Sequence, residues 1–599
     1  MSKFFVKSGQ NAKTSGRRAK KSWKMRLNEQ SEKAGDHFSK FFINRLASVI
    51  EVRLWVTEWA LLVLLVFLLA VVQVIWYEQA HKTPAFVAGG TYTEGALGDV
   101  KSLNPLYAST DSEKILARLL FANLVSPDSS GNEKAELAKS VTMDESGKIW
   151  TLVLRNNLKW SDGEAIDADD VLYTIDLISD TSAKTTIKAD FSHIKIEKID
   201  DLTVKFTLPS VYLDFMDSLE FPLLPAHKLA EIKSALVYEN EFSLAPVGSG
   251  PFVINAIQKG DVNDGFKQAV YLNRNDKYFG RNAKLNGYTL KVYASTEEII
   301  AALNSGSIMG SAALGLSAKD QLNTTISRRT SLLNSGVFAF INTETLSSVE
   351  LRQAIQRGVD MAKVREGMDD SQILDYPILA RQDAELSYPE LAKYSLDDAK
   401  ALIEKAGLKF DKEGKIVDGE GTAFTLNMAV LNRETLTTVA ERFAEQLRAI
   451  GFGVQLEIID DSQVGVDFFT SVVQPRNFDI LVYEVDMGVS ADPFVYYSST
   501  QASSSGWNLS NYENSLADDA LLSARTTTSL KLRKAKYEAF LKYWVNDVPS
   551  IGIYQSGMNY YYATNTQIFS ENIQLTDVYD RFMDVEDWAV EKKSVELTP

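Results

Sequence analysis

Alternating and helical patterns of apolar residues follow one another along most of the chain. Residues 204–208 alternate between apolar and polar side chains, which predicts a half-buried strand. Between residues 439 and 450, Phe443, Leu447 and Ile450 recur with helical spacing. Gly451 is expected to end that helix, and residues 454–458 to begin a strand. This order of elements predicts a mixed α/β fold.

Residues 151–171 combine a strand, a tight turn and a helix start. Residues 151–158 carry typical strand side chains, and Ser-Asp-Gly at 161–163 is a turn signal in which glycine supplies a positive φ. Asp167 is placed to cap a helix that begins near Ala168, and two further aspartates follow in its first turn.

The longest apolar run lies near the N-terminus, from Trp59 to Tyr77. It contains no charged residue, and Gln73 is its one strongly polar side chain. Nineteen residues at 1.5 Å each give about 28 Å, enough to cross the hydrocarbon core of a bilayer. Aromatic residues, Trp55 and Trp76 among them, lie near both ends, where a membrane–water interface favours them. The run predicts one transmembrane helix rather than a buried core helix.

The charge distribution predicts which side of the membrane each end occupies. Residues 1–53 carry a net charge of +9, whereas the whole chain of 599 residues carries −16, which leaves −25 for the remainder. The excess of Lys and Arg places the N-terminus in the cytoplasm and the large acidic part outside. A cleaved signal peptide, cut after Ala85 or Ala88, is the competing interpretation.

The N-terminal tail has two recognisable parts. Residues 13–26 are polar and basic, which predicts disorder and attraction to anionic lipid. Phe38, Phe42, Val49 and Ile50 have roughly helical spacing, which predicts an amphipathic helix on the inner membrane surface. Nothing in the tail supports binding to nucleic acid.

The residue types present give little support to catalysis or to metal binding. There is no cysteine, which excludes disulfides, thiolate catalysis and Cys-ligated metals. The four histidines are dispersed and belong to no metal-binding pattern, and no nucleophile or phosphate-binding motif is present. We therefore expect no catalytic residues, no metal site and no cofactor.

The wording of residues 154–171, LRNNLKWSDGEAIDADDV, closely resembles a signature of the family 5 extracellular solute-binding proteins, the peptide- and nickel-type receptors of ABC importers. Further segments resemble family motifs in the same order along the chain: 101–105, 115–124, 247–252, 272–280, 338–342, 351–360, 398–407, 447–451, 478–479, 492–493 and 548–551. The chain is identified as a member of this family over roughly residues 90–580.

The resemblance implies a two-lobed, periplasmic-binding-protein-like clamshell of the large three-subdomain type, preceded here by one transmembrane helix. The expected boundaries follow the chain: 1–58 basic cytoplasmic tail with the amphipathic helix, 59–77 membrane anchor, 78–88 linker, 89–342 lobe one with two subdomains, 343–545 lobe two, and 546–599 return to lobe one and C-terminal tail. The lobes of such a receptor close on a ligand held between them.

The resemblance also implies a function: a membrane-anchored receptor that captures peptides outside the cytoplasm and delivers them to ABC permease subunits. Family members hold an extended peptide largely through main-chain hydrogen bonds, with side chains in wet pockets. Two segments correspond to those that line the family's cleft, and the expected ligand-binding residues are Tyr107, Thr110, Asp111, Tyr483, Glu484, Val485, Asp486 and Asp492.

The second of these segments departs from the family pattern. Peptide receptors of the family carry a tryptophan and then an aspartate that pairs with the peptide's α-ammonium, but Val489 occupies the aspartate's position here. Asp486, three residues earlier, is either its replacement, able to bind a cation by charge-assisted bonds, or the cap of a turn. Two alternatives therefore stay open: a receptor for another solute, such as an oligosaccharide, and a signalling or scaffold ectodomain without a ligand.

Overall fold

The computed structural model describes residues 53–80, 82–187, 191, 193–260, 265–368, 371–382, 385–460, 467–504, 506–571 and 573–596. They divide into two units, one with residues up to 85 together with those from 592, and one with residues 86–591. Residues 1–52 of the predicted basic tail, with its amphipathic helix, lie outside the described residues, and residues 53–58 belong to a helix instead.

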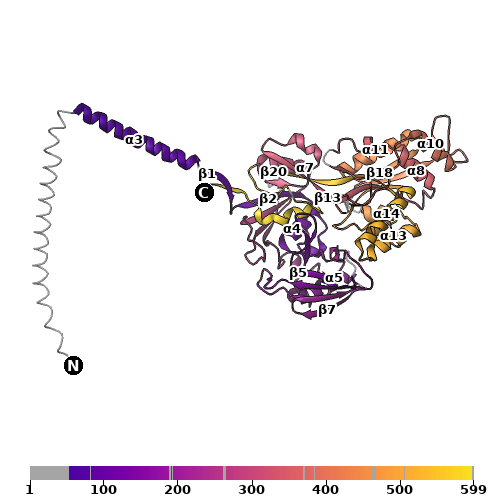
Figure 1. Cartoon of the computed structure of the whole chain (residues 1–599), viewed down its shortest axis with the longest axis horizontal. Helices are drawn as coiled ribbons and strands as arrows, with labels where there is room; N and C mark the ends of the chain where they lie inside the picture. Colours follow the sequence, from indigo (N-terminus) through magenta and orange to yellow (C-terminus); the bar gives the residue numbers. More distant parts are fainter. Residues whose placement is uncertain are drawn as a thin grey trace, which may run out of the picture. The chain divides into compact units, whose positions relative to one another are not determined.

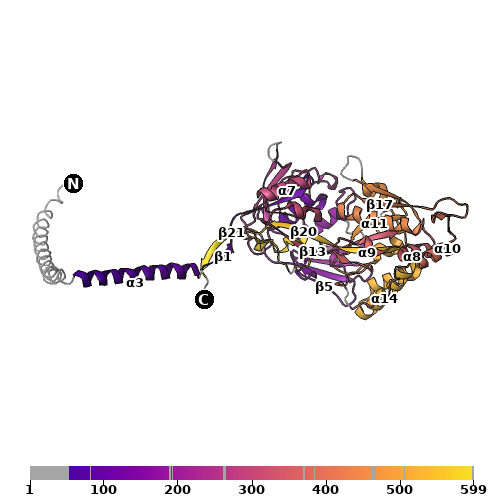
Figure 2. The same ribbon diagram turned by 90° about the horizontal axis from the view of Figure 1, so that it is seen from above.

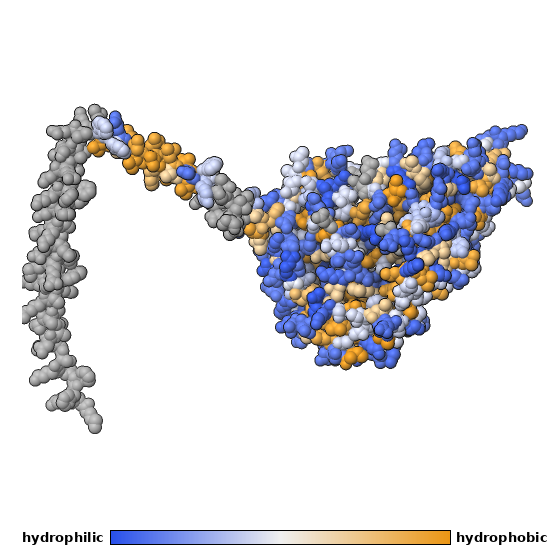
Figure 3. Space-filling view, in the orientation of Figure 1, coloured by the Kyte–Doolittle hydropathy of each residue, from blue (hydrophilic) through white to orange (hydrophobic). Residues whose placement is uncertain are grey.

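The first unit contains a long apolar helix, α3 (Arg53–Ala80). Its candidate membrane span, Trp55–Tyr77, has 23 residues with a mean hydropathy of 2.7, and none of its most apolar window is buried. Figure 3 shows apolar side chains covering the middle of this helix. The helix includes the whole predicted span of 59–77 and is long enough to cross a membrane.

The segment predicted to be a linker, 78–88, is regular structure instead. Helix α3 continues to Ala80, and strand β1 (Lys82–Val87) follows almost at once. Strand β1 pairs with β21 (Glu591–Glu596) in a two-stranded sheet. The local pattern of residues 78–88 gives no sign of this pairing, because the partner strand comes from the other end of the chain.

The second unit is organised around one mixed sheet, whose strands run in the order β18-β17-β19-β13-β20-β12-β2-β11-β10-β9, with β14 beside β20. The strands are β2 (Thr91–Leu97), β9 (Phe252–Lys259), β10 (Gln268–Arg274), β11 (Gly287–Tyr293), β12 (Gly310–Ser311), β13 (Ile326–Ile341), β14 (Gln372–Ile373), β17 (Thr425–Leu431), β18 (Gly453–Ile459), β19 (Ile480–Asp486) and β20 (Ser550–Ala563). A separate antiparallel sheet has the order β5-β6-β8-β7, from β5 (Ala138–Met143), β6 (Ile149–Leu154), β7 (Lys195–Asp200) and β8 (Thr203–Thr207). The small pairs are β3 (Val125–Pro127) with β4 (Glu133–Ala135), and β15 (Lys409–Phe410) with β16 (Ile416–Val417).

Helices pack around both halves of the large sheet (Figures 1 and 2). They are α4 (Asp111–Leu120), α5 (Ala168–Ser179), α6 (Ala226–Leu229), α7 (Thr296–Ser305), α8 (Val349–Gly358), α9 (Met361–Val364), α10 (Leu396–Lys405), α11 (Glu434–Ile450), α12 (Phe494–Tyr497), α13 (Ser515–Thr526) and α14 (Leu530–Asp547). The predicted helix at 439–450 and strand at 454–458 correspond to α11 and β18, and Gly451 ends α11 at a φ of 121°. The mixed α/β fold is confirmed.

The hydrophobic core is divided between two lobes. We define lobe one by a core drawn mainly from residues 92–292 and 558–588, and lobe two by cores drawn from residues 337–554. Strands β13 and β20 pair along almost their whole length and belong to both lobes. Figure 1 shows these two strands running from the side of β2 and α4 toward the side of α8 and α11. They are the strands about which the lobes could rotate.

Both lobe boundaries therefore lie inside strands, and neither matches its predicted position. Val337 and Ile341 belong to the core of lobe two, although lobe one was predicted to extend to residue 342. Val548, Ile551 and Tyr554 also lie in lobe two, although the return to lobe one was predicted at 546. The crossing in β13 falls at Asn334, Ser335 and Gly336, where the pairing with β20 shifts register while the strand continues without ending.

The segment of residues 151–171 folds as predicted. Asp167 caps α5 by accepting a hydrogen bond from Asp169 N, and Gly163 adopts a φ of 107° in the preceding turn. Trp160 is fully buried and donates from Nε1 to Asp170 Oδ2 at 3.0 Å. Asp170 also accepts from Ala226 N at 2.8 Å, so it connects α5 to the start of α6. These residues build lobe one and do not reach the junction between the lobes.

Candidate functional site

The first predicted binding segment, at the start of α4, is largely structural. Tyr107 is buried, and its hydroxyl has no hydrogen-bond partner. Thr110 caps α4: its hydroxyl accepts from Glu113 N at 3.2 Å and donates to Asp99 O at 2.9 Å. Asp111 is exposed and accepts from the hydroxyl of Tyr579 at 2.8 Å.

A cavity of about 810 Å³ opens beside this segment. Its lining combines lobe one with Asp467 and Phe469 of lobe two. The neighbours Ala108 and Ser109 line it, whereas Tyr107, Thr110 and Asp111 do not. The remaining lining residues include Lys114, Arg118, Asp577 and Tyr579.

The second predicted segment divides between the two faces of strand β19. Side chains alternate along a strand, so neighbours point to opposite faces. Val485 is 4% exposed and packs in the core of lobe two, and Tyr483 stacks on Phe468 with ring centroids 6.0 Å apart. Glu484 and Asp486 lie on the exposed face. Of the four consecutive predicted residues, only these two carboxylates are exposed.

Glu484 and Asp486 are reached by water, yet protein atoms crowd around them. Loss of hydration raises the pKa of both carboxyls, and each is raised further by a neighbouring carboxylate. Asp486 Oδ1 also accepts from Gly488 N at 2.9 Å, which is the turn-capping geometry. Asp486 thus caps a turn and still presents its charge to the solvent of the cleft.

Two carboxylates of lobe one approach Asp486. Glu220 and Asp577 are both exposed to water, and crowding by protein raises the pKa of each. After loss of hydration, the charge of Asp580 is the largest cause of the raised pKa in both Glu220 and Asp577. The charge of Asp486 raises the pKa of both residues as well. Asp580 itself is buried and accepts from Thr576 N at 2.9 Å. We call Glu220, Asp486 and Asp577 the acidic triad.

The carboxylates of the acidic triad interact through their charges, which raises the pKa of Glu220 and of Asp577. Glu220 is stabilised in part by Arg118, but Arg118 is already paired with Glu136 at 3.0 Å. Like charges that raise one another's pKa create a negative potential, and a cation placed among them would relieve it. Among the described residues, no group of His, Cys, Asp and Glu is arranged to hold a metal ion. The arrangement suits an organic cation such as an ammonium group.

A second interlobe cavity of about 750 Å³ carries positive as well as negative groups. Arg381 donates to Leu575 O at 2.7 Å and forms no ion pair within the part of the chain that the structure describes. Asn334 is 1% exposed, and its Oδ1 lacks a hydrogen-bond partner within the described part of the chain. The other lining residues include Glu133, Asp214, Gln382, Ser490, Lys531 and Gln574.

Asp492, the last predicted site residue, lies in the loop after β19 and is paired within lobe two. Arg525 pairs with it at 3.2 Å, and burial raises the pKa of the Asp492 carboxyl. Glu220 and Asp577 were missed by sequence reasoning. They lie hundreds of residues apart, and no local motif marks either of them.

The comparisons with known proteins agree with one another. The family model of the bacterial extracellular solute-binding proteins, family 5 (middle), matches residues 133–508. The oligopeptide-binding protein AppA of Bacillus subtilis (strain 168) is 25% identical over 507 residues, which cover 81% of this chain and 88% of that protein.

Solved structures show the same fold. The structure of AppA from Bacillus subtilis in complex with a nonapeptide matches with a TM-score of 0.69 and 22% identity, over 85% of this chain and all of that one. NikZ from Campylobacter jejuni in complex with Ni(L-His) also matches with a TM-score of 0.69 and 22% identity, over 83% of this chain and 99% of that one. The two-lobed architecture, the clefts between its lobes and the match over more than half its length lead to one conclusion: the chain belongs to the family 5 bacterial extracellular solute-binding proteins.

Proposed function

We propose that this protein captures peptides in the cleft between its lobes and delivers them to an ABC importer. The acidic triad is the observation that carries the proposal, because it offers an accessible negative site where a ligand's ammonium could be held. Glu484, from the same face of β19, adds a fourth carboxylate beside it. The protein acts by binding and releasing its ligand, without catalysis.

Three features support a peptide over a neutral sugar oligomer. The interlobe cavities carry charges of both signs, which match the two ends of a zwitterionic chain. The unpaired Asn334 Oδ1 is an acceptor for a ligand N–H group. AppA of Bacillus subtilis, which this chain matches over 88% of that protein's length, is described as an oligopeptide-binding protein, and its solved structure holds a nonapeptide.

We further propose that α3 remains attached and anchors the receptor, with its N-terminus in the cytoplasm. The apolar span of 23 residues suits a bilayer core, and the +9 charge before it follows the positive-inside pattern. A fixed anchor would keep the receptor next to the permease that receives its ligand.

A thermal-shift titration of the full-length protein in detergent tests the binding proposal. A mixed pool of short peptides is compared with sugar oligomers and with free amino acids. A ligand at a hundred times its dissociation constant stabilises the native state by about 2.7 kcal/mol, so the melting temperature should rise clearly with peptides. A shift with sugars alone, or none with any ligand class in a cooperatively melting sample, would contradict the proposal.

A further inference from the structure

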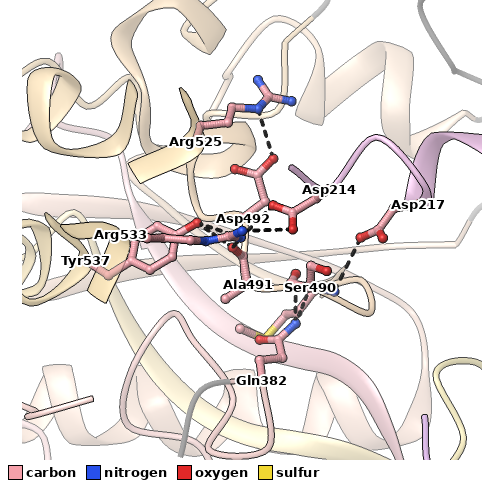
Figure 4. A network of polar contacts seen from close by, with 10 residues as sticks. Asp214, Asp217, Gln382, Ser490, Ala491, Asp492, Arg525, Arg533 and Tyr537 are labelled. Atoms are coloured by element: carbon pink, nitrogen blue, oxygen red, sulfur yellow. Dashed lines mark hydrogen bonds and ion pairs between the residues drawn. The ribbon is translucent and has the colours of Figure 1, made fainter. Parts of the chain in front are cut away.

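A network of polar contacts joins the two lobes at their rim (Figure 4). Lobe one contributes Tyr212, Asp214 and Asp217, from the loop that follows β8 and the start of η3 (Asp217–Leu219). Lobe two contributes Ser490 from the loop after β19, Arg525 from α13 and Arg533 from α14. We call these six residues the lobe latch.

The centre of the lobe latch is a buried ion pair between the lobes. Arg533 Nη1 and Nη2 donate to the two oxygens of Asp214 at 3.0 and 2.5 Å. The two side chains are only 13% and 8% exposed. Paired donors on paired acceptors fix both distance and orientation, and solvent screening is weak at this depth. Opening of the lobes would separate these two charges.

A second contact holds one cation between rings of both lobes. The guanidinium of Arg525 lies 4.4 Å from the ring centroid of Tyr212 in lobe one and 4.7 Å from that of Phe494 in lobe two. Arg525 also pairs with Asp492 at 3.2 Å. A cation over an aromatic face is attracted by it, more so when water is excluded. Separation of the lobes would remove Tyr212 from this stack.

The third contact is a single long hydrogen bond, and not an ion pair or a cation–π contact. Asp217 Oδ2 accepts from Ser490 N at 3.4 Å, while the buried Asp217 Oδ1 has no hydrogen-bond partner among the residues that the structure describes. Arg533, whose charge lowers the pKa of Asp217, is already paired with Asp214. An amide oxygen at this position could accept the same hydrogen bond without placing an unpaired charge in the contact. Asp217→Asn is therefore a comparison variant within the lobe latch, because it should leave the lobes together.

We infer that the lobe latch holds the lobes closed through groups of the chain itself, so that closure does not depend on a ligand. Asp214 and Arg533 are then positioning residues, which set the distance between the lobes and thereby control entry to the cleft. The claim that the lobe latch controls ligand exchange rests on the proposed function. The closure itself can be tested without any ligand, so the inference and the proposed function can fail independently.

The absence of cysteine from the chain allows a direct distance measurement. Asp201→Cys in lobe one and Glu420→Cys in lobe two are both exposed positions outside the latch. Spin labels are attached to both in the full-length protein, reconstituted in nanodiscs, and the distance distribution between them is measured by pulsed electron paramagnetic resonance.

We expect one narrow short distance in this labelled parent and in Asp217→Asn. Arg533→Gln should give a longer and broader distribution, and the exchange Asp214→Arg with Arg533→Asp should restore the short one. Lys534→Gln is the matched control, since this neighbour on α14 pairs with Glu385 inside lobe two at 3.7 Å and should leave the distance unchanged. If Arg533→Gln does not fold, Asp214→Asn makes the same test from the other lobe.

Three results would overturn the inference. The labelled parent could show a broad open distribution without ligand. Arg533→Gln or Asp214→Asn could keep the short distance while remaining folded by circular dichroism. Lys534→Gln could open the lobes as far as Arg533→Gln does, which would mean that loss of any α14 cation, rather than of the latch, separates them.

Discussion

At the scale of single residues, alternation along one strand decides which side chains can meet a ligand. Glu484 and Asp486 are exposed, while Val485 between them packs into lobe two. The sequence interpretation placed all three at the site because a motif locates a segment but not its faces. It did identify Asp486, and both functions considered for that residue are compatible with its geometry.

Asp486→Asn separates the charge of this residue from its turn. An asparagine Oδ1 can still accept from Gly488 N, so the fold should be kept, while the negative charge is lost. Loss of one charged hydrogen bond, about 1.5–3 kcal/mol, should weaken a peptide with a free amine roughly ten- to hundred-fold. Calorimetric titration with the same peptide, free and N-acetylated, measures this. Equal weakening of both forms would remove the ammonium-binding role.

The pKa shifts of the acidic triad predict how affinity depends on pH. Loss of hydration and neighbouring carboxylates, Asp580 among them, raise the pKa of Glu220, Asp486 and Asp577, so all three become protonated at higher pH than free carboxyls. A cationic ligand binds the ionised forms and lowers those pKa values. Affinity should therefore rise as the pH increases from about 4, the ordinary carboxyl range, toward neutrality.

Titrations in buffers of different ionisation enthalpy check this pH dependence. Binding below neutrality should release protons, and the release should shrink in Asp486→Asn. An affinity that stays constant between acid and neutral pH, with no proton released, would show that the triad does not contact the ligand's charge.

At the scale of elements, the start of α5 shows how local signals build the scaffold. Turn, cap and helix were predicted within residues 151–171, and the structure has them there. The pattern could not show that Asp170 would also accept from Ala226, because that partner lies more than fifty residues further along the chain.

Asp170→Ala should destabilise lobe one much more than Asp169→Ala. The first change leaves buried donors on Trp160, Ala226 and Asp167 without their acceptor, a loss of about 3 kcal/mol in the free energy of unfolding. Asp169 is exposed and pairs only with Lys198 at the surface, so its loss should change stability by about 0.5 kcal/mol or less. Urea unfolding of both variants gives the comparison, and equal losses would contradict it.

At the scale of the whole molecule, the anchor and the lobes follow from different kinds of information. The apolar span and the charge before it are visible in consecutive residues. The arrangement of the lobes depends on β13 and β20, which pair with each other and contribute side chains to the cores of both lobes. The two lobes therefore share one sheet.

The proposed topology predicts which cysteines a reagent outside the cell can label. Ser22→Cys precedes the span and Asp201→Cys follows it. In intact cells an impermeant maleimide should label Asp201→Cys alone, and Ser22→Cys only after permeabilisation. The protein should also stay in the membrane fraction after alkaline extraction. Release of a protein that begins near residue 86 or 89 would favour the cleaved signal peptide instead.

The sequence by itself determined the apolar span, the charge asymmetry, the α/β character, many of the local elements and the family resemblance. Each depends on residues close together in the chain, where periodicity, turn chemistry and capping act. Only the tertiary structure decided which distant residues meet: Glu220 with Asp486 and Asp577, Asp214 with Arg533, and β1 with β21. These pairings are set by packing across the whole chain, and no local pattern encodes them.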